Sequence, residues 1–385
     1  MNAFLARQYY YYRALFASHS CTFGLMTEQR TVNGEPGNQN LMYIDTSPFA
    51  TNIKQVIMYK IFILAFVCFS ASCNTSDNIG SIERIDPSLD AIISPGAQPE
   101  IIADGFSWTE GPLWIEDKKM LLFSDVFTNN VYKWTAEKGD EVFLTTSGYT
   151  GSTPRSAELG SNGLLLSKEG KLVLCQHGNH QIAQMNADLD DPKPTYIALA
   201  SQFIGRRLNS PNDAAFHTNG DLYFTDPPYG LERGMEDTLK EIPWQGVYKI
   251  KPSGEVILLT DSITRPNGIA FFPGGKSVLV ANSDPNKPFW YSFDIENDSL
   301  VNGKIFYNAF AHITEGKGLP DGLKIDKNGN VFATGPGGVF IFNRQGKLLG
   351  KIKLPVAPSN CAFSADQKTL YITATNYVLR LKMRD

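Results

Sequence analysis

From residue 98 onward, the chain repeats one short pattern six times. Each copy begins with Glu, Asp or Asn and a small or polar residue, runs through an apolar stretch to a turn, and continues in a second apolar stretch. The six copies begin at Glu110, Asn162, Asn212, Asn267, Asp321 and Asn360. Successive copies begin about 50 residues apart, and the last two begin about 40 residues apart. This spacing is close to the length of a four-stranded propeller blade. The repeat therefore predicts an all-β fold, a six-bladed β-propeller.

The turns and the ends of the repeat region agree with a closed ring. Thr218-Asn219-Gly220 and Lys327-Asn328-Gly329 both place a glycine where a tight hairpin turn needs a positive φ. A solenoid or a two-sheet sandwich is the alternative, but six units without capping repeats favour a ring. The segment 100–103 has no earlier strand with which to pair, so we expect it to close the ring by completing the last blade.

Charge and cysteine content exclude two classes of protein. The 385 residues carry 35 basic and 39 acidic side chains, a net charge of −4, so no basic surplus is available to bind nucleic acid. Cys175 and Cys361 lie far apart, each within an apolar run, which indicates two buried free thiols and not a disulfide framework. We expect a monomer whose partner is a small molecule.

The region before the repeat resembles an export signal. Met58-Tyr59-Lys60 is a short basic start, and an apolar stretch follows that ends at Ser70-Ala71-Ser72-Cys73. Cys73 stands where bacterial lipoproteins carry their lipidated cysteine, so we expect a periplasmic or outer-membrane lipoprotein of a Gram-negative bacterium, with the lipid as its sole membrane anchor. A buried core segment is the alternative. The predicted parts are a non-native or dispensable extension (1–57), a signal peptide (58–73), a tether (74–97) and the propeller domain (98–385).

The leading residues of the six copies predict a metal site. In a propeller the first strand of each blade lines the central channel, so these six side chains should converge on the axis. They supply two carboxylates and four carboxamides without His or thiolate, the ligand set of a hard cation such as Ca²⁺, with Mg²⁺, Mn²⁺ or Zn²⁺ as alternatives. In a single copy, a bond to nearby backbone would explain the Asn or Asp equally well. Six copies in register favour one divalent metal.

Four copies carry longer motifs, which are Glu110-Gly111-Pro112, Ser210-Pro211-Asn212-Asp213, Arg265-Pro266-Asn267-Gly268 and Pro320-Asp321-Gly322. Through them, residues from about 98 to 385 resemble the SMP-30/gluconolactonase/regucalcin family, and in particular its bacterial gluconolactonase branch. The resemblance implies a catalytic metal held by Glu110, Asn212, Asn267 and Asp321. It also implies hydrolysis of a sugar lactone, with Asp321 as the catalytic carboxylate.

Further residues are candidates for contacting the substrate. His177 lies in a strand expected near the channel, and Tyr149 lies in a glycine-flanked loop. Some members of the family carry a substrate-binding Arg two residues before the ring Asn, but this chain has Ser210 there, which leaves Arg206 or Arg207 as the candidate. The candidate substrate contacts are Tyr149, Asn162, His177, Arg207 and Asn360.

The predicted mechanism follows from the oxygen ring. A bound Ca²⁺ would polarise a lactone carbonyl, water would attack, and Asp321 would act as general base or directly as nucleophile. The sequence contains neither a G-x-S-x-G nor an H-E-x-x-H motif. Two other functions are open: hydrolysis of an organophosphate or another ester at the same site, and a non-catalytic ligand-binding propeller, for which an apolar axis would be expected.

Overall fold

The computed structural model describes residues 78–384, so the predicted extension (1–57), the signal peptide (58–73) and Cys73 lie outside the described residues. The described residues belong to one compact unit, Asn74–Asp385. They form strands and four short 3₁₀ helices, which are η1 (Pro87–Ala91), η2 (Glu116–Lys118), η3 (Gly234–Glu236) and η4 (Phe310–His312). Among residues 78–384, no helix has the length and the apolar character needed to cross a lipid bilayer.

The first three blades are four-stranded antiparallel sheets whose strands follow chain order. The first consists of β3 (Thr109–Ile115), β4 (Met120–Asp125), β5 (Asn130–Thr135) and β6 (Gly139–Thr145). The second consists of β7 (Ser161–Leu166), β8 (Leu172–Gln176), β9 (Gln181–Met185) and β10 (Tyr196–Ala200). The third consists of β13 (Ala214–Phe216), β14 (Leu222–Asp226), β15 (Gly246–Ile250) and β16 (Val256–Thr260).

The fourth blade repeats this plan, and the last two add strands from the start of the described chain. The fourth consists of β17 (Pro266–Phe271), β18 (Ser277–Asp284), β19 (Lys287–Glu296) and β20 (Ser299–Asn308). The fifth contains β21 (Leu323–Ile325), β22 (Val331–Gly335), β23 (Gly338–Phe342) and β24 (Leu348–Lys353). The sixth contains β25 (Pro358–Phe363), β26 (Thr369–Ala374) and β27 (Tyr377–Lys382).

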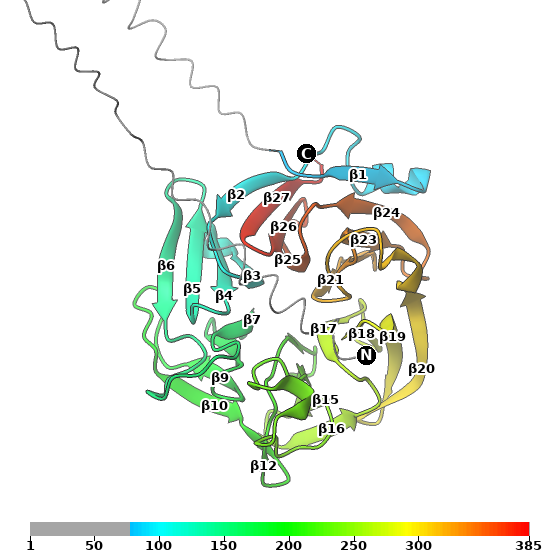
Figure 1. Ribbon diagram of the computed structural model, residues 1–385. Helices are drawn as coiled ribbons and strands as arrows, with labels where there is room; N and C mark the ends of the chain where they lie inside the picture. The colour runs from blue at the N-terminus through cyan, green and yellow to red at the C-terminus, as the bar shows by residue number, and fades with distance from the viewer. Residues whose placement is uncertain (1–77, 385) are drawn as a thin grey trace, which may run out of the picture. The chain divides into compact units, whose positions relative to one another are not determined.

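The six sheets are arranged in a ring around a central axis (Figure 1). The innermost strand of each blade contacts the innermost strand of the next, and β25 returns to β3, which closes the circle. The predicted six-bladed β-propeller is therefore confirmed, and the solenoid and the two-sheet sandwich are excluded.

The strand that closes the ring is the predicted one. The strand β2 (Glu100–Asp104) pairs antiparallel with β27 and becomes the outer strand of the sixth blade. Glu100 lies opposite Arg380 in this pairing, and Arg380 Nε donates to its carboxylate at 2.6 Å. The ring is thus closed by segments that lie about 280 residues apart in sequence.

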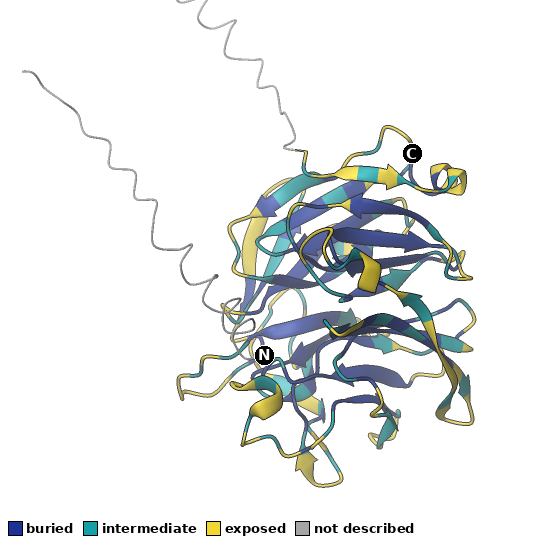
Figure 2. Cartoon of the chain, turned by 45° about the vertical axis from the view of Figure 1, so that its right-hand side comes forward, coloured by how far each residue is buried: buried dark blue, intermediate teal, exposed yellow. Residues whose placement is uncertain are grey.

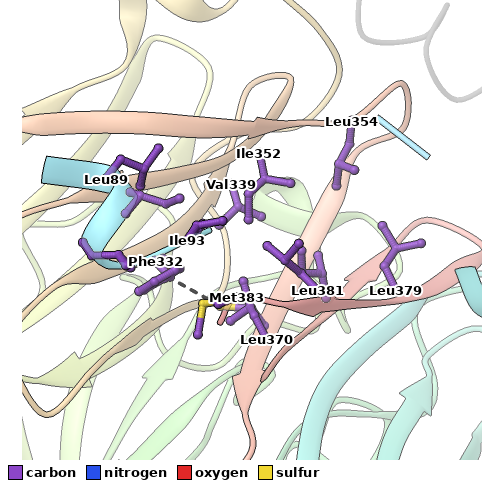
Figure 3. Packing of buried hydrophobic residues seen from close by; sticks show 14 of the residues in the cluster. Leu89, Ile93, Phe332, Val339, Ile352, Leu354, Leu370, Leu379, Leu381 and Met383 are labelled. Carbon is purple, nitrogen blue, oxygen red and sulfur yellow. Dashed lines mark hydrogen bonds between the residues drawn. The ribbon is translucent and has the colours of Figure 1, made fainter. Parts of the chain in front are cut away.

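The tether predicted for residues 74–97 is wrong for the part that the structure describes. The strand β1 (Ser81–Arg84) pairs antiparallel with β24 and gives the fifth blade a fifth strand. Leu89 within η1 and Ile93 just after it are fully buried in an apolar cluster shared with the fifth and sixth blades (Figure 3). The segment packs because its apolar side chains, set among Ser, Asp and Gly, still bury a substantial area.

The core lies between neighbouring blades. Burial decreases from the inner strands to the outer edges of the sheets (Figure 2). In the second blade, β8 is fully buried and β10 is largely exposed or half-buried. The apolar clusters combine side chains of adjacent sheets, so each blade depends on its neighbours for burial. Cys175 and Cys361 are buried free thiols within these layers, as predicted.

Candidate active site

The six leading residues of the repeat lie on, or directly before, the innermost strands. Five of them are at most 4% exposed, and Asp321 is half-buried. In β3, β7, β17 and β25 the pairing with the next strand shifts register at the leading residue. Such a bulge takes a side chain out of the regular alternation of a strand. The repeat therefore uses irregular backbone to present its polar side chains at the channel.

Close approach of the inner strands brings the ring residues together. Gly268 follows Asn267, and a Cβ at this position would stand 2.4 Å from the carbonyl oxygen of Asp321 in the next blade. Between the second and third blades, the Gly163 N–H donates to the Asn212 carbonyl at 2.8 Å. The glycine after the leading residue thus allows direct backbone contact between blades and keeps the ring narrow.

Glu110 is an enclosed carboxyl group in this ring. Its Oε2 accepts a hydrogen bond from the Gly111 N–H at 2.9 Å and one from Asn360 Nδ2 at 3.3 Å. Burial raises the pKa of Glu110 to about 8, and the charges of Asp213 and Glu158 add to this, against the effect of the Gly111 bond. A buried acid among other acids is strongly stabilised in its charged form by a cation.

A second layer of polar groups supports the ring. Asp213 accepts the Ala214 N–H at 2.9 Å, and its other oxygen lies 3.4 Å from Asn360 Nδ2 and 3.8 Å from Lys324 Nζ. The side-chain oxygen of Asn360, Oδ1, accepts from the Cys361 N–H at 2.9 Å and from Lys324 Nζ at 3.4 Å. Asn360, predicted to contact substrate, therefore has protein partners at both ends of its amide and links Glu110 to Asp213.

Asp321 occupies a different environment in the same ring. Burial, followed by the charges of Glu110 and Glu158, raises its pKa well above the usual range. Its Oδ1 is enclosed and has no hydrogen-bond partner among the described residues. Beside it, Asn267 Nδ2 donates to Ser283 Oγ at 2.9 Å, which fixes the orientation of the amide. The Asn267 oxygen is then left for another partner.

The ring fits an oxygen-preferring cation. Within residues 78–384, Oδ1 of Asn162, of Asn212 and of Asp321 is buried without a hydrogen-bond partner. Each such atom costs about 1–3 kcal/mol, and a hard cation can satisfy several of them at once. The described chain holds no cluster of three or more His, Cys, Asp or Glu side chains placed for a metal. An ion here would therefore depend on carboxamides as much as on carboxylates.

The connection between β6 and β7 brings further groups to the site. Glu158 Oε2 lies 3.0 Å from Nδ1 of His177, which is fully buried. The charge of Glu158 also raises the pKa of Glu110 and of Asp321, which places this carboxylate beside the ring. Tyr149 lies in the same connection, with its ring under the Arg155 guanidinium at 5.2 Å. Two of the predicted substrate contacts, Tyr149 and His177, thus share one neighbourhood.

Arg207 does not join them. It lies in β12 (Arg206–Arg207), which pairs with β11 (Gln202–Phe203) in a hairpin at the outer edge of the third blade (Figure 1). Its backbone N–H donates to Glu241 at 2.7 Å and its guanidinium donates to the Leu239 carbonyl at 2.8 Å. Ser210, where some relatives carry an Arg, is buried and bonded to backbone of its own blade.

The prediction from sequence missed four groups of the site. Asp213 and Lys324 form the supporting layer. Glu158 and Tyr229 lie beside Asp321. Burial raises the pKa of the Tyr229 hydroxyl above its usual range, and the charges of Asp321 and Glu158 raise it further. Asp213 carried a signal, because it replaces the glycine that follows the leading residue in four other copies. Glu158 lies in a connection without any periodic pattern.

Comparison with known proteins relates both the sequence and the fold to one group. Residues 108–376 match the SMP-30/Gluconolactonase/LRE-like region. A gluconolactonase from Zymomonas mobilis is 36% identical over 313 residues, which cover 80% of this chain and 87% of that protein. The diisopropyl-fluorophosphatase of Loligo vulgaris is 28% identical over 181 residues, which cover 44% of this chain and 55% of that protein.

Solved structures show the same relationship. A gluconolactonase from Xanthomonas campestris superposes with a TM-score of 0.68 at 27% identity, covering 80% of this chain and 96% of that one. A calcium-binding protein, regucalcin, from Agrobacterium tumefaciens superposes with a TM-score of 0.56 at 16% identity, covering 74% and 94%. The second likeness concerns the fold alone.

Proposed function

Because the chain belongs to the SMP-30/gluconolactonase/LRE-like family, we propose that it is a metal-dependent hydrolase that opens a sugar lactone at the axial ring. The observation that carries the proposal is the set of enclosed oxygens without hydrogen-bond partners among the described residues, at Asn162, Asn212 and Asp321. The gluconolactonase relatives support lactones as the substrate class. The hard-oxygen donor set supports Ca²⁺ as the ion.

Five of the six ring residues have a role in this proposal. The ion would be held by Glu110, Asn212, Asn267 and Asp321. When bound, it supplies a Lewis acid for the lactone carbonyl oxygen. Asn360 and the Gly111 N–H hold the Glu110 carboxylate in place, and Ser283 holds the amide of Asn267. In the supporting layer, Lys324 Nζ lies 3.8 Å from the Asp213 carboxylate and offsets its charge.

Asp321 is the group that handles the proton. Its enclosed Oδ1 has no hydrogen-bond partner among the described residues, so its lone pairs are available to accept a proton from an attacking water. The water oxygen then bonds to the acyl carbon, the acyl–oxygen bond of the lactone ring breaks, and the released ring oxygen takes up the proton. In the second route the Asp321 carboxylate itself attacks the acyl carbon, the acyl–oxygen bond of the ring breaks, and the released ring oxygen takes a proton from water. Hydrolysis of the resulting mixed anhydride then releases the hydroxy acid and restores Asp321.

Hydrolysis of glucono-δ-lactone by the full chain tests the proposal. We expect activity with added Ca²⁺, loss of activity after chelation, and at least about a hundredfold lower kcat in Asp321→Ala, in the range that acid–base residues contribute. Retained activity after complete chelation, or in Asp321→Ala, would refute the metal-dependent mechanism.

A phosphoester is the second candidate substrate. Similarity to the squid diisopropyl-fluorophosphatase over part of the chain supports it, and an oxygen-held cation can polarise a phosphoryl oxygen as well as a carbonyl oxygen. A panel of organophosphates assayed beside the lactone decides between them. Higher kcat/KM for an organophosphate would replace the lactone as the substrate class.

We also propose export as a lipoprotein, on the basis of residues 58–73 and Cys73. Intact mass and membrane fractionation of the cell-made protein test this. Cleavage before Cys73 with added acyl mass is the expected result, and retention of residues 1–57 would overturn it.

A further inference from the structure

The site contains a buried imidazole whose hydrogen bonds are not satisfied. His177 is fully buried, and neither ring nitrogen has a hydrogen-bond partner among residues 78–384. Glu158 Oε2 lies 3.0 Å from Nδ1, but the ring is not aligned for a hydrogen bond in this conformation. Leaving a buried polar atom unpaired costs about 1–3 kcal/mol, so a hydrogen-bond partner for each ring nitrogen would stabilise this arrangement.

The surroundings of His177 leave little freedom for the ring to move elsewhere. Its backbone N–H donates to the Gly160 carbonyl at 3.2 Å. A Cβ on Gly230 would stand 2.9 Å from the His177 Cβ and 2.7 Å from the Ser210 Cβ, so Gly230 packs closely against the base of the His177 side chain. The imidazole can therefore gain a bond by turning about its own axis, toward Glu158, more readily than by leaving its place.

The segment that carries Glu158 is fastened over this region from two sides. Arg155 donates to the Gly178 carbonyl at 2.7 Å and to the Gly230 carbonyl at 3.1 Å, which belong to the second and third blades. Thr150 bonds Asn179 through its N–H and its hydroxyl. These bonds hold the connection between β6 and β7 next to the ring, and they set the position of the Glu158 carboxylate.

We propose that Glu158 is a positioning residue that fixes the His177 tautomer, so that His177 Nε2 accepts a hydrogen bond from a hydroxyl group of the substrate. With Nδ1–H directed at the Glu158 carboxylate, Nε2 carries a lone pair and can only accept. A hydroxyl of a polyhydroxylated lactone is a suitable donor for it. This inference rests on the proposed lactonase function, because it assigns the specificity of the same site.

A pair of lactones separates this role from a structural one. Glucono-δ-lactone carries ring hydroxyls and δ-valerolactone carries none. In Glu158→Ala we expect KM for glucono-δ-lactone to rise about tenfold more than KM for δ-valerolactone, because a contact made equally in ground and transition states acts on KM. The loss of the Glu158 charge beside Asp321 acts on both lactones alike and cancels in this comparison. Glu158→Gln, which keeps an acceptor oxygen for Nδ1–H, should restore KM to within about threefold.

Two controls accompany these variants. Glu169→Ala removes an exposed carboxylate from a hairpin turn of the second blade, and it should leave all constants and the melting temperature unchanged. Nitrogen-15 NMR of the histidines in the full chain reports the tautomer without any substrate. We expect the Nδ1–H form of His177 in the wild type and its loss in Glu158→Ala.

The outcomes are distinct. An equal rise of KM for both lactones, an unchanged KM for glucono-δ-lactone, or an unchanged tautomer in Glu158→Ala would overturn the inference. If the wild type hydrolyses neither lactone, the proposed function fails, and the NMR measurement still decides whether Glu158 sets the tautomer of His177.

Discussion

At the axis, neighbouring blades contribute chemically different groups to one ring. Glu110 and Asp321 bring carboxyl groups with raised pKa values, and Asn212 brings an enclosed amide oxygen. Asp213, one residue further along, lies against Lys324 and Asn360 in the supporting layer. Two consecutive positions of the repeat thus serve two purposes, since the leading residue faces the proposed ion and the second residue either allows close packing or supports the ring.

Asn212→Ala should weaken Ca²⁺ binding by removing one of the enclosed oxygens. An ion that binds only the folded protein stabilises it by about 2.7 kcal/mol at a hundred times its Kd, and a hundredfold weaker site loses most of that. The measurement is the rise in melting temperature on adding Ca²⁺ to the chelated protein. Asn286→Ala, in an exposed turn, is the control and should keep the full rise. An equal rise in both variants would exclude Asn212 as a ligand.

The buried His180, which lies outside the ring, should make the folded protein less stable in acid. Burial lowers its pKa to about 4, although the Asn209 carbonyl against Nδ1 opposes this. The unfolded chain takes up the proton near pH 6.5, whereas the folded protein resists it down to about pH 4. Stability should therefore fall as the pH drops through this window, by up to about 3 kcal/mol.

Urea unfolding at pH 7 and pH 5 measures this effect. His180→Asn removes the titrating ring and suits the positive φ of 56° at this position, so the variant should lose less stability between the two pH values than the wild type. Equal losses in His180→Asn and the wild type would show that other groups cause the acid sensitivity.

At the scale of strands, the sequence was informative where a pattern recurred. Six copies with glycine turns predicted the blades, and the unpaired segment 100–103 predicted the closing strand. The strand β1 was missed because four residues with half-buried and exposed side chains give no apolar alternation. Glu158 was missed because the connection that carries it is positioned by Arg155 through backbone carbonyls of other blades, which leave no mark in the local sequence.

Gly268→Ala tests the close approach of inner strands. The added Cβ would stand 2.4 Å from the Asp321 carbonyl oxygen and 2.7 Å from Gly322 Cα, both backbone atoms that cannot turn away. We expect a loss of about 2–3 kcal/mol, as for other overpacked sites, measured by chemical denaturation, with weaker lactone hydrolysis from a displaced Asp321. Gly96→Ala, which meets no atom within 4 Å, is the control. A variant as stable and active as Gly96→Ala would contradict the close packing.

At the scale of the whole molecule, the first strands of the described chain pair with strands of the last two blades. The strand β2 completes the sixth blade and β1 extends the fifth, so one continuous segment joins two neighbouring sheets. Arg84 donates to the carbonyls of Ile93 and Ser94 at 3.0 and 2.7 Å, and Arg384 donates to the Ala91 carbonyl at 2.8 Å. If these contacts bind the segment to the core, it should unfold together with the propeller.

Leu89→Ala decides whether it does. Leu89 is fully buried in the cluster with the fifth and sixth blades (Figure 3), and truncating such a leucine costs about 3 kcal/mol. If segment and ring unfold as one unit, calorimetry should show a single transition lowered by about 5 °C. Leu239→Ala, at a position 73% exposed, should leave the transition in place. If the segment detaches on its own, Leu89→Ala will leave the main transition unchanged and will speed amide exchange in β1 alone. The reason is that a segment which opens locally contributes nothing to the free energy of global unfolding.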